Sequence, residues 1–310
     1  MFDENKGFYP TKKIFAIFYQ EKPDTGSSLA LFLPPVQYKM MKRYFALLTI
    51  VLFTACTGSD KPDHDETVDV KREIVAAPAA LNFSISAQYP HDTSSYIQGL
   101  QFYKGKLYEG SGDYANSSLR VTDIKTGKVE KKHMMGSEKI FGEGITIFKD
   151  KIYQLTWESH DVYVYDIKNI DKPVKTLRWP YAGWGITNNG NELIISDGTS
   201  NIYFVDDSMN VKNTLQVKDN AGFVTYLNEL EFIDGFIYAN VYLTSSIVKI
   251  DPANGHVVGR LVLPDLMKQY APDYTPAEGE VLNGIAWDSA TKKMYITGKR
   301  WPKMFEGTIQ

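Results

Sequence analysis

The chain has 310 residues, a formal net charge of −3 and 43% apolar residues. This length can bury a large core and allows one or two domains. The nearly balanced charge, with no Lys/Arg-rich run beyond the segment MKRYF, argues against nucleic acid as a partner. The 20 tyrosines favour strands over helices.

A basic start followed by an apolar run lies inside the chain. From Met40 the sequence reads MMKRYFALLTIVLFTAC, and its apolar part is too short to span a bilayer in the ordinary way. This pattern predicts a signal peptide at 40–55. Because a signal peptide works at a terminus, residues 1–39 are predicted to lie upstream of the true start. The polar stretch at 56–80 predicts a flexible tether.

Cys56, the only cysteine, follows the apolar run directly. Phe53, Thr54 and Ala55 before it resemble the lipobox of bacterial lipoproteins, so Cys56 is predicted to carry a lipid anchor. A buried cysteine that acts as a small hydrophobe is the alternative. The anchor would attach the protein to a membrane of the bacterial cell envelope, facing the periplasm or the cell exterior.

After residue 80 the chain repeats itself. Each repeat has an alternating apolar run, a turn rich in Gly, Asp or Asn, and a second alternating run, and the better preserved repeats add a third and a fourth strand. The five repeats begin at Gln98, Glu143, Trp184, Asn228 and Asn283. Four strands in about forty residues are typical of one propeller blade. The sequence therefore predicts an all-β fold at 81–310, a five-bladed β-propeller with four-stranded antiparallel blades, and a β-sandwich is the alternative.

The last repeat is short of strands. The segment LNFSISAQYP at 81–90 precedes the first repeat and alternates like a strand. We therefore expect it to close the last blade, which would remove exposed sheet edges.

The innermost strand of each blade lines the central channel, so equivalent residues of the repeats should form rings. The first ring is Gln98, Glu143, Trp184, Asn228 and Asn283. The second ring is Gly112, Trp157, Gly198, Tyr242 and Lys299. One carboxylate, one ammonium, amides and aromatic walls predict a site for a small molecule or a peptide end. Residues that only fill the channel and satisfy one another are the alternative.

Glu143 stands between Gly142 and Gly144 in the run IFGEGIT. Glycines add almost no side-chain volume, so the carboxylate is predicted either to be exposed in a turn or to point into a space that they keep open.

Several motifs resemble the glutamine cyclotransferase family over residues 84–308. They are SYIQGL, FGEGIT, QLTW, GWGIT, DGTSNIYF, LNELE, ANVY, VLNGIAWD and TGKRWPKMFE. The resemblance implies a five-bladed propeller that acts as a glutaminyl-peptide cyclotransferase. This acyltransferase converts the N-terminal glutamine of peptides or proteins to pyroglutamate and releases ammonia.

The resemblance also implies roles for individual residues. Glu143 matches the acid that the family needs for proton transfer, and Lys299 suits the charge that develops on the amide oxygen. Gln98 and Asn228 match polar contact residues, and Asn283 joins them from the first ring. The implied aromatic walls are Tyr96, Phe141, Trp157, Trp184 and Tyr242. The family pattern usually has Phe at the position of Tyr96 and Trp at that of Tyr242.

The five histidines show no HxxEH motif, no i, i+4 pair and no cysteine partner, so we expect no zinc site. We also expect a metal-independent monomer without a cofactor. A calcium-dependent lactonase propeller is a weaker alternative, because it would need several acidic or amide ligands around one ion, and the inner ring offers only Glu143 and the amides. The main alternative is a lipid-anchored propeller without catalytic activity that binds peptides or small molecules at its channel mouth.

Overall fold

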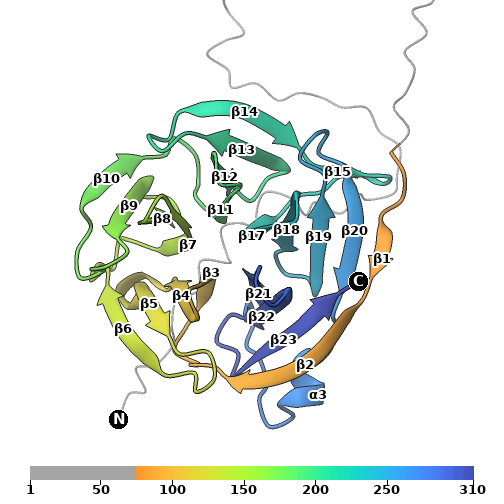
Figure 1. Ribbon diagram of the computed structural model, residues 1–310, viewed down its shortest axis with the longest axis horizontal. Helices are drawn as coiled ribbons and strands as arrows, with labels where there is room; N and C mark the ends of the chain where they lie inside the picture. The colour runs from red at the N-terminus through yellow and green to blue at the C-terminus, as the bar shows by residue number, and fades with distance from the viewer. Residues whose placement is uncertain (1–74) are drawn as a thin grey trace, which may run out of the picture. The chain divides into compact units, whose positions relative to one another are not determined.

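The computed structural model describes residues 75–310. These residues form five β-sheets arranged as blades around a centre (Figure 1). The predicted signal peptide, Cys56 and residues 56–74 of the predicted tether lie outside the described residues. Within 75–310, no helix combines the length and the apolar character needed to cross a membrane.

Each of the first three blades is a four-stranded antiparallel sheet whose strands follow one another in the chain. The first contains β3 (Ile97–Tyr103), β4 (Lys106–Ser111), β5 (Ser118–Thr122) and β6 (Val129–Met134). The second contains β7 (Gly142–Phe148), β8 (Lys151–Thr156), β9 (Asp161–Asp166) and β10 (Lys175–Arg178). The third contains β11 (Ile186–Asn188), β12 (Leu193–Ser196), β13 (Asn201–Val205) and β14 (Val211–Gln216).

The last two blades add strands from the beginning of the described chain. The fourth contains β17 (Leu227–Ile233), β18 (Phe236–Val241), β19 (Ser246–Ile250), β20 (Val257–Val262) and β1 (Ala79–Leu81). The fifth contains β21 (Leu282–Asp288), β22 (Lys293–Gly298), β23 (Lys303–Ile309) and β2 (Phe83–Pro90). The smaller elements are a hairpin of β15 (Lys218–Asp219) and β16 (Gly222–Phe223), the 3-10 turn η2 (Tyr114–Asn116) and the helix α3 (Leu266–Tyr270). The predicted five-bladed propeller is confirmed, and the β-sandwich is wrong.

The ring closes through β2, as the alternating pattern of 81–90 indicated. β2 pairs antiparallel with β23, from Phe83 opposite Ile309 to Pro90 opposite Lys303. The expected end of the tether at residue 80 needs a correction, because Ala79 and Ala80 already pair with β20 in parallel. β1 has only three residues, AAL, and they do not alternate, so the sequence gives no signal for this strand. Together β1 and β2 cover the outer edges of two blades.

Alternate side chains of each strand point to opposite faces of its blade, and facing blades bury them against each other. One such cluster between the third and fourth blades includes Ile194, Ile202, Leu230 and Ile237. The innermost strands β3, β7, β11, β17 and β21 surround the centre (Figure 1). Apolar packing between blades therefore fixes where the ends of these five strands lie.

Candidate active site

The first ring of predicted residues gathers at one end of the innermost strands. Gln98, Glu143, Asn228 and Asn283 are each the second residue of their strand, and Trp184 lies just before β11. Direct contacts hold the strand ends together. Gly144 N donates to Trp184 O at 2.8 Å, and Ser196 Oγ bridges the third and fourth blades by accepting from Gly185 N and donating to Asn228 O.

The pairing register is interrupted at this place in four of the five innermost strands. The irregularities fall at Ile97/Gly99, Gly142/Ile145, Leu227/Leu230 and Leu282/Ile285. Each interruption contains the ring residue of its blade. A β-bulge of this kind leaves a residue outside the ladder and changes the direction of its side chain. The bulges thus free Gln98, Glu143, Asn228 and Asn283 from regular strand geometry.

The two glycines beside Glu143 do not keep a space open, so this expectation is wrong. A Cβ added to Gly144 would lie 2.7 Å from Trp184 O, and one added to Gly142 would lie 2.7 Å from Met135 Sδ. Two different blades fill the volume beside them, because Trp184 belongs to the third blade and Met135 follows the last strand of the first. At Gly144 the innermost strands approach so closely that no side chain fits between them.

Glu143 is a buried carboxylate, and only 4% of the residue is exposed. Its Oε2 has no hydrogen-bond partner in the described part of the chain. Burial raises the pKa of the carboxyl well above 4.5, while the charge of Lys299 opposes this change. An acid held in this way keeps its proton to a higher pH than an exposed glutamate does.

Lys299 lies directly after β22 and is 1% exposed. Its ammonium donates a hydrogen bond to Gln98 Oε1. It lies 4.5 Å from the ring centroid of Tyr96 and 5.2 Å from that of Tyr242, so both rings favour its charged form. Burial lowers the pKa of Lys299 to about 7, and the Glu143 carboxylate raises it. The site therefore holds an ammonium that titrates near neutral pH.

Three amides complete the polar part of the site, and all three residues are buried. Asn283 Nδ2 donates to Ile97 O at 2.9 Å and lies 3.4 Å from Gln98 Oε1. The Oδ1 atoms of Asn228 and Asn283 have no hydrogen-bond partner among residues 75–310. Buried acceptors without partners are rare in proteins. A ligand with N–H groups could satisfy these two oxygens and Oε2 of Glu143.

Aromatic rings meet edge to face around this polar group. Phe141 lies 6.1 Å from Tyr96 and 6.0 Å from Trp157, and Trp184 lies 5.7 Å from Tyr242. The five predicted wall residues thus form two connected groups of rings. Their edge-to-face geometry is the arrangement that aromatic pairs favour.

The second ring alternates glycines with larger side chains for a steric reason. A Cβ on Gly112 would lie 2.3 Å from the ring of Phe141, and one on Gly198 would lie 2.5 Å from the ring of Trp184. Both glycines therefore make room for aromatic walls.

Two wall contacts were not expected from the sequence. Tyr114 on η2 lies 5.0 Å from Phe141, and the Tyr96 hydroxyl donates to Gly279 O at 3.4 Å. Both Tyr114 and Gly279 belong to connections between strands, where the repeat gives no signal.

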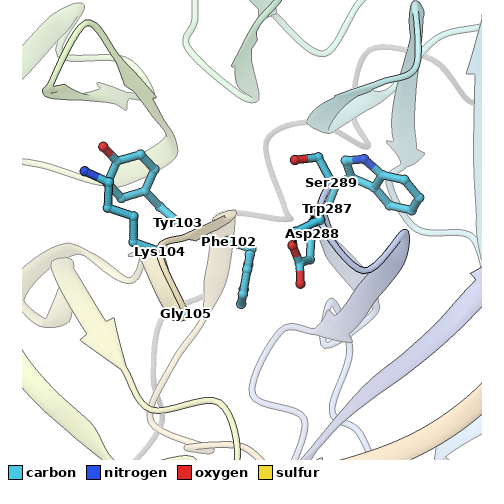
Figure 2. Close-up of a pocket in the computed structure, with 8 residues that line it drawn as sticks. Phe102, Tyr103, Lys104, Gly105, Trp287, Asp288 and Ser289 are labelled. Atoms are coloured by element: carbon cyan, nitrogen blue, oxygen red, sulfur yellow. Dashed lines mark hydrogen bonds between the residues drawn. The ribbon is translucent and has the colours of Figure 1, made fainter.

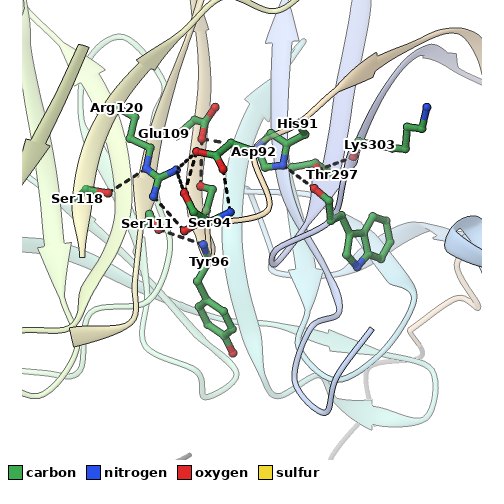
Figure 3. Close-up of polar contacts among 12 residues, drawn as sticks. His91, Asp92, Ser94, Tyr96, Glu109, Ser111, Ser118, Arg120, Thr297 and Lys303 are labelled. Atoms are coloured by element: carbon green, nitrogen blue, oxygen red, sulfur yellow. Dashed lines mark hydrogen bonds and ion pairs between the residues drawn. The ribbon is translucent and has the colours of Figure 1, made fainter. Parts of the chain in front are cut away.

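A buried polar network supports the segment that leads into β3 (Figure 3). His91 Nδ1 donates to Trp301 O at 2.9 Å, and its Nε2 lies 3.6 Å from Glu109 Oε2. Arg120 donates to Asp92 Oδ2 at 2.9 Å. Burial opposes the charged forms, but the His91–Glu109 ion pair raises the pKa of His91 and lowers that of Glu109. This network joins the first blade to the connection after Lys299, and no motif in the sequence indicates it.

A hollow of about 480 Å³ opens at the other end of the propeller (Figure 2). It is lined by the ends of β3 and β21 and the turns that follow them, including Phe102, Lys104 and Trp287. Gln98 lies at the opposite end of β3. The carboxylate of Asp288 in this hollow already accepts hydrogen bonds from Ala290 N and Thr291 Oγ1. The hollow is therefore separate from the candidate site.

No group of three or more His, Cys, Asp or Glu side chains within residues 75–310 could hold a metal ion.

The fold and the site together define a β-propeller with a buried carboxylate and a buried ammonium at the end of its channel. Over residues 50–309 the chain matches the family model for glutamine cyclotransferase, and it belongs to this family. It is 37% identical over 225 residues to the glutaminyl-peptide cyclotransferase of Arabidopsis thaliana. The aligned region is 72% of this chain and 69% of that protein. The crystal structure of Myxococcus xanthus glutaminyl cyclase is also similar, with a TM-score of 0.69 and 32% identity over 75% of this chain and 98% of that chain.

Proposed function

We propose that this protein is a glutaminyl-peptide cyclotransferase that converts N-terminal glutamine to pyroglutamate and releases ammonia. The observation that carries the proposal is Glu143, a buried carboxylate with an unpartnered oxygen and a raised pKa beside Lys299. Family membership supports the same reaction.

The reaction is an intramolecular acyl transfer. The α-amine of the substrate forms a bond to its own side-chain γ-carbonyl carbon, and the bond from that carbon to the amide nitrogen breaks. An α-amine has a pKa of about 7.7 to 8.0, so much of the substrate arrives protonated. Glu143 takes a proton from the amine and later gives one to the departing ammonia. Its raised pKa suits both steps, because it makes Glu143 a stronger base towards the amine than an exposed glutamate would be.

Lys299 has the second role in this mechanism. As the amine attacks, negative charge develops on the γ-carbonyl oxygen, and a fixed ammonium stabilises that charge. The hydrogen bond to Gln98 and the rings of Tyr96 and Tyr242 hold the Lys299 ammonium in place. The group therefore needs little reorganisation when the charge appears.

The amides and the aromatic walls fold the glutamine. The free Oδ1 atoms of Asn228 and Asn283 can accept the carboxamide or amine N–H groups of the substrate. The site holds the amine against its own carbonyl in one side-chain rotamer. This orientation can supply a large part of the rate enhancement.

The deciding experiment is to incubate the purified protein with a dipeptide that begins with glutamine and to follow ammonia. The same dipeptide with N-terminal asparagine is the matched control, because its ring closure would be strained. The proposal is supported if the glutamine peptide releases ammonia and its mass falls by the mass of ammonia, while the asparagine peptide shows neither change. Binding without release would favour the propeller that only binds.

We further propose that catalysis needs no metal, because Glu143 and Lys299 can provide both the proton transfer and the charge stabilisation. Turnover is expected to survive strong chelation. Loss of turnover on adding a chelator, with recovery on adding zinc, would contradict this.

We also propose that the protein is a monomer held in the bacterial cell envelope by a lipid on Cys56. The apolar run before Cys56 supports the anchor. The substrates would then be peptides or proteins that reach the periplasm or the cell exterior.

A further inference from the structure

The fourth blade breaks the pattern of its neighbours next to the site. The residue after the ring residue is a glycine in four repeats, namely Gly99, Gly144, Gly185 and Gly284. The fourth repeat has Glu229 at this position, and the residue is 1% exposed. A carboxylate is almost never buried to this extent without partners.

Both oxygens of Glu229 accept hydrogen bonds from the backbones of other blades. Leu100 N of the first blade donates to Oε1 at 3.1 Å, and Ile285 N of the fifth blade donates to Oε2 at 2.8 Å. The first and fourth blades are not neighbours in the ring. The Glu229 side chain therefore joins strands of three blades in the centre of the propeller.

These contacts lie next to three candidate site residues. Leu100 is two residues after Gln98, Ile285 is two residues after Asn283, and Glu229 directly follows Asn228. The positions of these three amides are thus coupled through one carboxylate. Gln98 in turn accepts the hydrogen bond of Lys299.

We propose that Glu229 is a positioning residue that holds the amide-binding half of the active site in its catalytic geometry. The expected effect on kcat rests on the proposed cyclotransferase activity. The expected effect on the positions of the amides rests on the backbone contacts of Glu229. Glu229 does not touch the reacting atoms in this scheme. It fixes the bulged ends of β3, β17 and β21, where regular ladder hydrogen bonds are interrupted.

Glu231 provides a matched control. It lies two residues along the same strand, roughly 7 Å further from the ring of site residues. It is buried like Glu229, and it accepts from Trp287 N at 3.1 Å and from Thr187 Oγ1 at 3.3 Å. Glu231 thus matches Glu229 in residue type, in burial and in accepting from a backbone N–H of the fifth blade, but its contacts lie away from the amides.

The test compares Glu229→Gln with Glu231→Gln in the purified protein. A glutamine can accept only through its one oxygen, and its NH2 group would face a backbone N–H. Both variants are expected to melt at a lower temperature than the parent. Glu229→Gln is expected to lower kcat about 10- to 100-fold with a smaller change in KM, because small misplacements of positioning groups are costly. Glu231→Gln should keep kcat within about threefold of the parent.

A second readout does not depend on activity. The side-chain amide signals of Gln98, Asn228 and Asn283 in NMR spectra of the ligand-free protein should shift in Glu229→Gln and stay in place in Glu231→Gln. If the parent releases no ammonia, the proposed function fails, while these signals still decide the role of Glu229.

Two results would overturn the proposal. One is a Glu229→Gln variant with parental kcat and unmoved amide signals, and the other is an equal loss of kcat in both variants. If Glu229→Gln does not fold, Glu229→Asp replaces it with the same criteria, because the shorter carboxylate keeps its charge but cannot reach both N–H groups.

Discussion

Replacing Glu143 by glutamine tests the proposed mechanism most directly. Glu143→Gln keeps the size of the side chain and one acceptor, but it removes proton transfer, which is typically worth about 10²- to 10⁴-fold in rate. A second loss adds to the first. The Glu143 carboxylate raises the pKa of Lys299, so without it that pKa falls and a smaller fraction of the lysine is charged. We therefore expect kcat to fall by at least the proton-transfer factor.

The same substitution should leave the fold intact. Burying a carboxylate with an unpartnered oxygen is unfavourable, and a neutral amide of equal size removes that cost. We therefore expect an unchanged or higher melting temperature for Glu143→Gln. KM should change much less than kcat, because the aromatic walls and the amides remain.

The assay is ammonia release at saturating glutamine dipeptide, with circular dichroism and thermal melting on the same samples. Glu158→Gln is a suitable control, since Glu158 is an exposed carboxylate next to Trp157. It should retain parental turnover. If Glu143→Gln turns over at nearly the parental rate, Glu143 only lines the channel and the acid–base role belongs to another group.

Three further changes test other parts of the account. Trp184→Ala should raise KM more than it lowers kcat in steady-state kinetics, because it removes a wall that packs against Tyr242; an effect confined to kcat would contradict this. Cys56→Ser should release the protein from membranes in fractionation, and unchanged attachment would refute the lipid anchor. His91→Gln should lower the melting temperature most at pH 5 to 6.5, since the raised pKa of His91 gives stability that is present below about 6.5 and lost as the pH rises; a pH-independent difference would refute the ion pair.

The architecture could be predicted from the sequence because a propeller is periodic. Each blade buries its faces against the next, so the same alternation and the same turns recur along the chain. The closing strand β2 was also predictable, since Phe83–Pro90 alternates over eight residues. β1 was not, because three residues carry no period.

The ring of site residues followed from the repeat, but the reason for its geometry did not. Whether a Cβ fits at Gly144 depends on the backbone of Trp184, which belongs to the next blade. Glu229 was missed for a similar reason. Local sequence favours exposure of a glutamate, and only the N–H groups of Leu100 and Ile285, more than fifty residues away, make its burial possible.

The propeller centre contains three buried carboxylates, those of Glu143, Glu229 and Glu231. Their hydrogen-bond partners indicate which of them can act on a substrate. Glu229 and Glu231 use their oxygens as acceptors for groups of other blades, so a substrate would have to break hydrogen bonds of the fold to reach them. Burial raises the pKa of all three, so the pKa alone does not distinguish a catalytic group. Of these three carboxylates, Glu143 alone combines burial with an unpartnered oxygen and an ammonium that influences its charge. A carboxylate whose acceptor capacity the fold has not used remains available to a substrate amine, and this difference assigns the proton transfer to Glu143.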